Sequence, residues 1–189
     1  MIDSLNDQFV LRAETPAIWA LSARRLKWSG DLLFDAYAED LEAMASGVSP
    51  LELRNLEVAG PATLLLGLAT ENILKAIAMQ KDPQSVKNGK IRDWPSGHDL
   101  VRLSGMASVA LNNERRDLLQ RMGRFVEWAG RYPVPKKVTK LGMKQTGINR
   151  PFPPLPLQPH ERPGFNTLFD ELYSVVITDV AGSAADDAG

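Results

Sequence analysis

The sequence predicts an all-α fold, an antiparallel bundle of four to five main helices with a long proline-rich loop before the last helix. Three observations favour it: apolar residues recur at helical spacing in several long segments, most connections between them are short, and no segment shows strand alternation. The 189 residues are enough for one domain, expected over 1–181, followed by a disordered, small and acidic tail over 182–189.

The first long helix is predicted from residue 17 to about residue 45. Pro16 suits its entry, because a missing amide hydrogen does no harm in the first turn, and Ser46-Gly47 followed by Pro50 ends it. Two apolar stripes run along it, which predicts a wide buried face. One stripe consists of Ile18, Leu21, Trp28 and Leu32, and the other of Trp19, Leu26, Leu33, Tyr37, Leu41 and Met44.

The second helix begins at Gly60-Pro61 and carries apolar residues on nearly every face, which is typical of a helix at the centre of a bundle. Asp82-Pro83 ends it, and the polar loop that follows is longer than most helix connections, which span about 2 to 8 residues. Charged residues interrupt the apolar run well short of the roughly 20 residues of a membrane span, so we expect no membrane helix.

The third and fourth helices are predicted from their end signals. Ser96 and Asp99 have capping-box spacing, which places the start of the third helix at about Gly97. The fourth helix, ERRDLLQRMGRFVEWA, follows Asn112 and is expected to end at Gly130 in a left-handed cap.

Eight of the thirteen prolines lie between residues 133 and 163, so this segment is predicted to be extended. A last amphipathic helix follows, and a second pair with capping-box spacing, Thr167 and Asp170, marks its predicted start. We expect this helix to seal the bundle.

The amino-acid composition limits the kinds of binding and catalytic site that the chain can form. The formal net charge is -1, so any site for a polyanion must be local. The absence of cysteine excludes disulfides, thiolate metal sites and a cysteine nucleophile, and favours a cytoplasmic location. With two histidines we expect no metal site, and no glycine-rich phosphate loop, serine triad or dinucleotide motif is present, so we expect no cofactor.

Polar residues on the otherwise apolar second helix are the first candidate site. Glu71 and Lys75 lie four residues apart on one face, with Asn72 beside them, and a buried charge is costly unless it is paired. The alternative is an ordinary stabilising Glu-to-Lys pair. His98, in SGHDL, is the candidate acid or base, and the alternative is a histidine bonded to the backbone at a helix start.

The stretch RFVEWAGRYPVPKK ends the fourth helix and leads into rigid proline chain, which fixes where Arg131 and Tyr132 point. Arg131 could pair with Glu71 or bind a phosphate, and Tyr132 could stack on a base. Alternatively, both residues hold the proline segment against the bundle. The following lysines are either phosphate contacts or a solvated charge run: Lys136, Lys137, Lys140 and Lys144.

Three phrases occur in the order seen in one group of helical proteins: GLATENILKAIAM on the second helix, GHDL opening the third and FVEWAGRYPVP closing the fourth. On these elements, over residues 64–135, the chain resembles the HEPN superfamily, in particular bacterial members with GHDL and W-x-G-R-Y-P elements. The resemblance implies a helical bundle that often dimerises. It also implies either a metal-independent ribonuclease or a non-catalytic binding module, with a cognate antitoxin as one kind of partner.

The sequence departs from the catalytic members of that family, which carry Arg-x(4–6)-His near the start of a late helix. This spacing occurs only from Arg92 to His98, in a loop, where we interpret it as coincidental. One hypothesis is therefore a homodimeric binding or interaction module whose polar cluster is structural or holds a nucleotide or RNA end. The cluster consists of Glu71, Asn72, Lys75, His98, Arg131 and Tyr132. The other is a ribonuclease with His98 as acid or base and Arg92 or Arg131 stabilising the phosphate.

Overall fold

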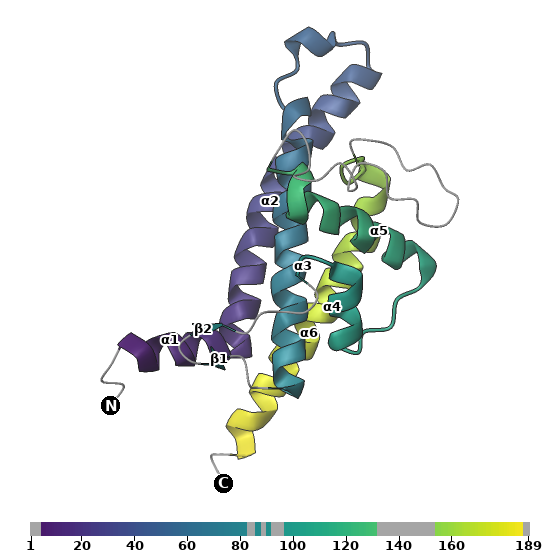
Figure 1. Ribbon diagram of the computed structural model, residues 1–189. Helices are drawn as coiled ribbons and strands as arrows, with labels where there is room; N and C mark the ends of the chain where they lie inside the picture. Colours follow the sequence, from purple (N-terminus) through teal and green to yellow (C-terminus); the bar gives the residue numbers. More distant parts are fainter. Residues whose placement is uncertain (1–4, 83–85, 88–89, 92–96, 132–153, 187–189) are drawn as a thin grey trace.

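The computed structural model describes residues 5–82, 86–87, 90–91, 97–131 and 154–186, and it confirms the all-α helical bundle (Figure 1). Its α-helices are α1 (Leu5–Glu14), α2 (Pro16–Ala45), α3 (Ala59–Lys81), α4 (Leu100–Met106), α5 (Asn113–Arg124) and α6 (Arg162–Asp186). Helix α6 continues past residue 182, where the sequence predicts a disordered tail. Residues 187–189 of that predicted tail lie outside the described residues.

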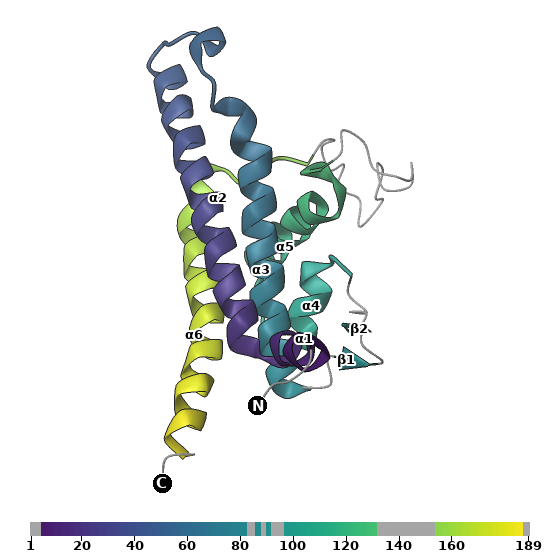
Figure 2. The same ribbon diagram turned by 90° about the vertical axis from the view of Figure 1, so that its left-hand side faces the viewer.

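Helix α3 lies at the centre of the bundle, as its apolar composition predicts. It contacts α2, α4, α5 and α6, and α2 also contacts α6. Figures 1 and 2 show α2 running antiparallel to α3 and α6, on the side of α3 opposite α4 and α5. The end of α2 and the start of α3, joined by the short 3-10 turns η1 (Pro50–Glu52) and η2 (Leu56–Val58), project beyond the other helices.

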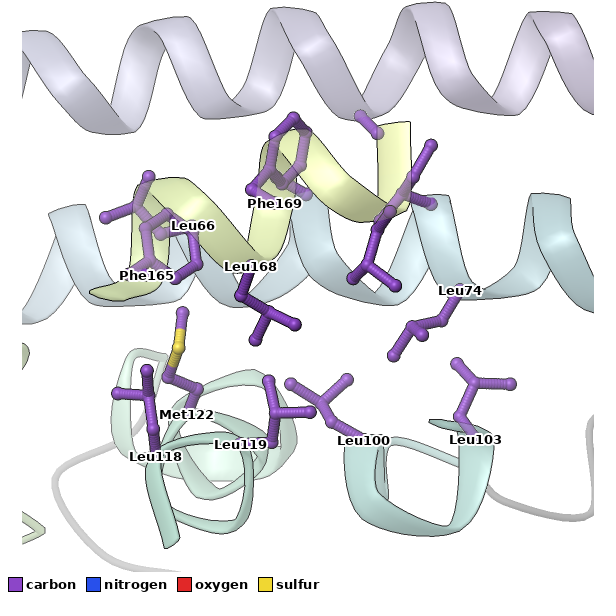
Figure 3. Close-up of a cluster of buried hydrophobic side chains, with 14 of the residues drawn as sticks. Leu66, Leu74, Leu100, Leu103, Leu118, Leu119, Met122, Phe165, Leu168 and Phe169 are labelled. Atoms are coloured by element: carbon purple, nitrogen blue, oxygen red, sulfur yellow. The ribbon is translucent and has the colours of Figure 1, made fainter. Parts of the chain in front are cut away.

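The hydrophobic core fills the space between α3, α6 and the pair α4 and α5. Figure 3 shows buried apolar side chains from α4 and α5 pointing toward α6 and α3. This burial explains why α6, distant in sequence, is part of the fold. The labelled core residues are Leu66, Leu74, Leu100, Leu103, Leu118, Leu119, Met122, Phe165, Leu168 and Phe169.

Two elements were not expected from the sequence. Helix α1 precedes α2 and is separated from it by Thr15. In the segment predicted to be a loop, β1 (Val86–Lys87) pairs antiparallel with β2 (Lys90–Ile91) in a short hairpin. Neither element has a strong periodic pattern, because both are too short for one.

Helix ends differ from their predicted positions where a capping residue was assigned wrongly. Helix α4 begins at Leu100, and Asp99 is its N-cap, accepting a hydrogen bond from the backbone N–H of Arg102 at 3.0 Å. Helix α6 begins at Arg162, ahead of the predicted start. Thr167 lies inside it and donates from its hydroxyl to the carbonyl of Pro163 at 3.0 Å, a bond that competes with capping.

The end of the fourth helix also differs from its prediction. Helix α5 passes into a π-helical segment, η3 (Phe125–Ala129), and Gly130 follows with a φ of -82°, so the expected left-handed cap is wrong. A close approach accounts for the glycine instead. A Cβ atom at Gly130 would lie 2.7 Å from the Cβ of Leu64 on α3, which only a glycine avoids.

The described end of the proline-rich segment is bound to the bundle. Residues 154–158 are neither helix nor strand, and Leu157 is buried, with its backbone N–H donating to the Thr63 hydroxyl at 2.9 Å. The turn η5 (Pro159–Glu161) then leads into α6, closed by a capping box between Gln158 and Glu161. Residues 132–153, which hold the rest of the predicted extended segment, lie outside the described residues.

The two apolar stripes of α2 differ in how far they are buried. In the second stripe Tyr37 is buried and most other members are partly buried against α3 and its neighbours. The first stripe is exposed: Trp28 is 72% exposed and Leu32 is 68% exposed, and Ile18 and Leu21 also face solvent. The predicted wide buried face is therefore wrong for this chain taken alone, because α3 and α6 cover only one side of α2.

One helical stretch of the described chain, Leu56–Lys81, is long and apolar enough to cross a membrane. Most of its apolar window, 72%, is buried inside the fold. This pattern is typical of the core helix of a soluble protein.

Candidate functional site

The candidate site is built on a carboxylate in the middle of the central helix. Glu71 is almost fully buried on α3, where an unpaired charge would be costly. Lys75, one turn later, places its Nζ 2.5 Å from Glu71 Oε1, and the two side chains are 13% and 5% exposed. The pair is therefore a buried ion pair, at the i,i+4 spacing of the ordinary stabilising Glu-to-Lys pair that the sequence also allows.

His98 supplies the second partner of the same carboxylate. Its Nδ1 lies 3.0 Å from Glu71 Oε2. Gly97 immediately before it has a φ of +54°, a conformation that favours glycine, and Asp99 immediately after it caps α4. These two neighbours fix the backbone on both sides of His98. The turn that starts α4 therefore places the imidazole next to Glu71 on α3.

The hydrogen bond to Glu71 orients the imidazole of His98. An ionised carboxylate only accepts hydrogen bonds, so Nδ1 is the donor and Nε2 is the ring nitrogen left for another partner. The His98 side chain is 44% exposed, and its Nε2 has no hydrogen-bond partner in the described part of the chain. The cluster therefore has a buried ion pair, Glu71 and Lys75, at its inner end, and the Nε2 atom of His98 faces solvent at its outer end.

Trp19 on α2 contacts the Lys75 side of the cluster. The ring of Trp19 lies with its centroid 5.8 Å from Lys75 Nζ, within the range of a cation–π contact. The indole N–H donates to the carbonyl of Ala13 on α1 at 3.0 Å, which fixes the ring at the corner between α1 and α2. Trp19 belongs to an apolar stripe in the sequence, and this role was not predicted, because its contact with Lys75 joins residues far apart in the chain.

Nε2 of His98 can interact with a ligand in two ways. On a neutral ring it is an acceptor, suited to a hydroxyl or to a proton in transfer, and on a protonated ring it donates to an anion. The geometry is that of a carboxylate-oriented histidine, which both structural and catalytic sites use.

Arg131 is not among the described partners of Glu71, which was one of the roles that the sequence offered for it. Arg131 Nη2 donates to the backbone carbonyl of Glu127 at 2.6 Å, and Gly130 next to it packs on Leu64. Leu64 precedes Glu71 by seven residues on α3, which is about 10 Å along the helix axis. The described contacts of Glu71 are with Lys75 and His98, so the expected closure of the cluster by Arg131 is not seen among them.

The remaining predicted residues divide into two groups. Asn72 is half-buried beside Glu71 on α3, and its side chain makes no hydrogen bond within the described residues. The others lie outside the described residues: Arg92, Tyr132, Lys136, Lys137, Lys140 and Lys144.

A separate pocket of about 470 Å³ lies between α2 and α6. It shares no residue with the Glu71 cluster, so the two are different features of the surface. In the part of the chain that the structure describes, no group of three or more histidine, cysteine and acidic residues is arranged to hold a metal ion. The pocket is lined by Arg24, Lys27, Trp28, Asp31, Phe169, Asp170 and Tyr173.

Comparisons of this chain with protein-family models, with curated proteins and with solved structures found no match.

Proposed function

We propose that the chain is a HEPN-like helical binding module, a cytoplasmic homodimer that holds RNA or a nucleotide at His98. One observation carries the proposal: a half-exposed histidine is bonded through Nδ1 to a nearly buried carboxylate, with Nε2 left for a ligand. A solvated surface histidine would not need a buried ion pair of Glu71 and Lys75 beneath it. The motifs that carry the HEPN resemblance contain Glu71 and His98, which supports the same assignment.

RNA or a nucleotide fits the chemistry of the open end. A phosphate oxygen accepts from a protonated imidazole, and a ribose hydroxyl donates to a neutral one, so His98 can bind either part of a nucleotide. The basic residues between 136 and 144, together with Tyr132, are the candidates for the rest of the contact. A cognate antitoxin protein is a further partner that the resemblance suggests.

A metal-independent ribonuclease is the second candidate. The observation that favours it is the orientation of His98 by Glu71, because a positioned histidine is the most frequent general acid or base in enzymes. Arg92 or Arg131 would stabilise the phosphate in that mechanism. We rank it second because the fourth and last helices lack the histidine of the family's nuclease motif.

Binding is tested by fluorescence anisotropy with labelled single-stranded RNA and with a labelled nucleotide, without added metal. Replacing His98 with alanine removes one hydrogen bond to a charged or hydroxyl group, which should weaken binding about tenfold or more. His160→Ala is the matched control, because His160 is exposed on η5 and the described contacts place it outside the cluster. Equal affinity of the wild type and His98→Ala would contradict the proposal.

Cleavage is tested on the same RNAs by gel electrophoresis in the presence of a chelator. We expect no cleavage by the wild type. Cleavage that His98→Ala abolishes and His160→Ala retains would establish the ribonuclease instead. Cleavage by all three proteins would point to a contaminant and leave the binding result to decide.

A further inference from the structure

Helix α2 exposes an apolar stripe, interrupted by Arg25, on the side that faces away from α3. Leu21, Trp28 and Leu32 lie on one face because they are seven and four residues apart. Tryptophan and leucine of this size are seldom left exposed together on the surface of a soluble chain unless a partner covers them. In particular, exposed tryptophan is enriched at the centres of protein interfaces.

The charges of α2 are segregated along its length. The charged residues of its first half are all basic, and those of its second half are all acidic. Some are used inside the fold: Lys27 pairs with Asp31, and Asp31 with Arg162. The basic residues are Arg24, Arg25 and Lys27, and the acidic residues are Asp31, Asp35, Glu39, Asp40 and Glu42.

The charged residues that flank the apolar stripe make few ion pairs with the rest of the described chain. Arg24 and Arg25 form no ion pair with any described residue. Asp35 is 67% exposed, and its described ion contact is a 3.7 Å approach to Arg162. Glu39 is exposed four residues later on the same face. Between Arg24 and Glu39, beyond Leu21, the face therefore presents cations, then the apolar side chains of Trp28 and Leu32, then carboxylates.

We propose that this face of α2 is the interface of the homodimer, formed by two copies of α2 packed antiparallel about a two-fold axis near residue 30. A two-fold interface must be self-complementary, since the same patch meets itself. Trp28 and Leu32 are equidistant from residue 30, so Trp28 packs on the partner's Leu32. Arg25 and Asp35 are also equidistant from it, so each Arg25 meets the partner's Asp35.

The antiparallel arrangement is the one that the charge order selects. A parallel pair would place cations against cations and carboxylates against carboxylates, which is unfavourable. From Arg25 to Asp35, the outer matched pair, the contact would extend about 15 Å along the helix. The acidic second half of α2 also argues against an anionic membrane surface as the occupant, because such surfaces attract cationic helices.

The pocket between α2 and α6 extends the proposed interface. Trp28 forms one wall of it, and Phe169 and Tyr173, stacked 6.2 Å apart, form another. It therefore offers apolar surface directly beside the stripe, where a side chain of the partner copy can insert. Pockets filled by one large apolar side chain are typical anchors of interfaces.

The test measures the dimer dissociation constant of the full chain by sedimentation equilibrium. Trp28→Ala should raise it at least tenfold, because a central aromatic contact is lost twice in a symmetric dimer. Arg25→Glu and Asp35→Arg should each raise it about tenfold by setting like charges against each other. The double variant Arg25→Glu/Asp35→Arg should restore dimerisation, because the swapped charges again face opposite ones. Arg102→Glu, exposed on α4, is the control for net charge.

The outcomes separate this inference from the homodimer proposed above, on which it rests. A wild type that stays monomeric at all concentrations overturns both. A dimer that Trp28→Ala and Arg25→Glu leave unchanged overturns the α2 face alone, and a double variant that stays monomeric overturns the antiparallel register. Co-sedimentation of the wild type with phosphatidylserine vesicles, lost in Trp28→Ala, would assign the face to a membrane instead. RNA binding by the His98 site is measured separately and does not depend on these results.

Discussion

Replacing Glu71 with alanine should destabilise the fold strongly, because two buried or half-buried donors lose their acceptor at once. Removing one partner of a buried ion pair costs about 3 to 5 kcal/mol. We expect the lower end, about 3 kcal/mol, because Lys75 can reach water along its flexible stem and His98 is half exposed. For a chain of this size, each kcal/mol lowers Tm by about 2 to 4 °C, so Tm should fall by about 6 to 12 °C.

The assay is thermal unfolding followed by circular dichroism, with two comparisons. Glu171→Ala removes a carboxylate that binds Arg115 but is 53% exposed, and it should lower Tm much less. The double variant Glu71→Met/Lys75→Met replaces both charges with apolar side chains and should be close to the wild type in stability. A Tm for Glu71→Ala within about 1 °C of the wild type would refute the buried cluster.

Two further predictions concern packing and pH. Gly130→Ala should lower the free energy of unfolding by about 1 to 3 kcal/mol, because it forces a Cβ atom against Leu64. Gly105→Ala, with open space in α4, should raise it by about 0.5 to 1 kcal/mol. Urea unfolding measures both, and equal effects would contradict the close approach at Gly130. The hydrogen bond from Arg115 lowers the pKa of Glu171 below its ordinary value of 4.5, so this pair stabilises the fold above that pH and ceases to do so as pH falls through the lowered pKa. The Tm difference between the wild type and Glu171→Gln should therefore be present at pH 7 and vanish at strongly acidic pH, and a difference that persists there would contradict this origin.

Helices that carry a long periodic pattern were predictable. The apolar composition of α3 and the Pro16 entry of α2 depend on neighbours along the chain, and the structure has both. Helix starts were less predictable, because several residues near each one can cap it. Asp99 caps α4, and Gln158 caps the turn η5 ahead of α6, although Ser96 and Thr167 begin segments with the same capping-box spacing.

The candidate site was predictable only in part. Glu71 and Lys75 stood out as charges on an apolar helix, and His98 as a scarce residue at a helix start. The contact between His98 and Glu71 depends on the turn at Gly97. The contribution of Trp19 depends on its packing against Lys75. These contacts join residues that are tens of positions apart, so periodicity and spacing carry no information on them.

The sequence by itself determined the helical class, the central place of α3 and the presence of charges that must find partners there, because each follows from residues within a turn or two of one another. Tertiary structure decided which charges meet and which apolar faces are covered. Both stripes of α2 look equally suited to burial in the sequence, yet α3 and α6 cover one and leave Trp28 and Leu32 in solvent. The physical reason is that burial depends on what the rest of the chain brings to a surface, which local sequence does not specify.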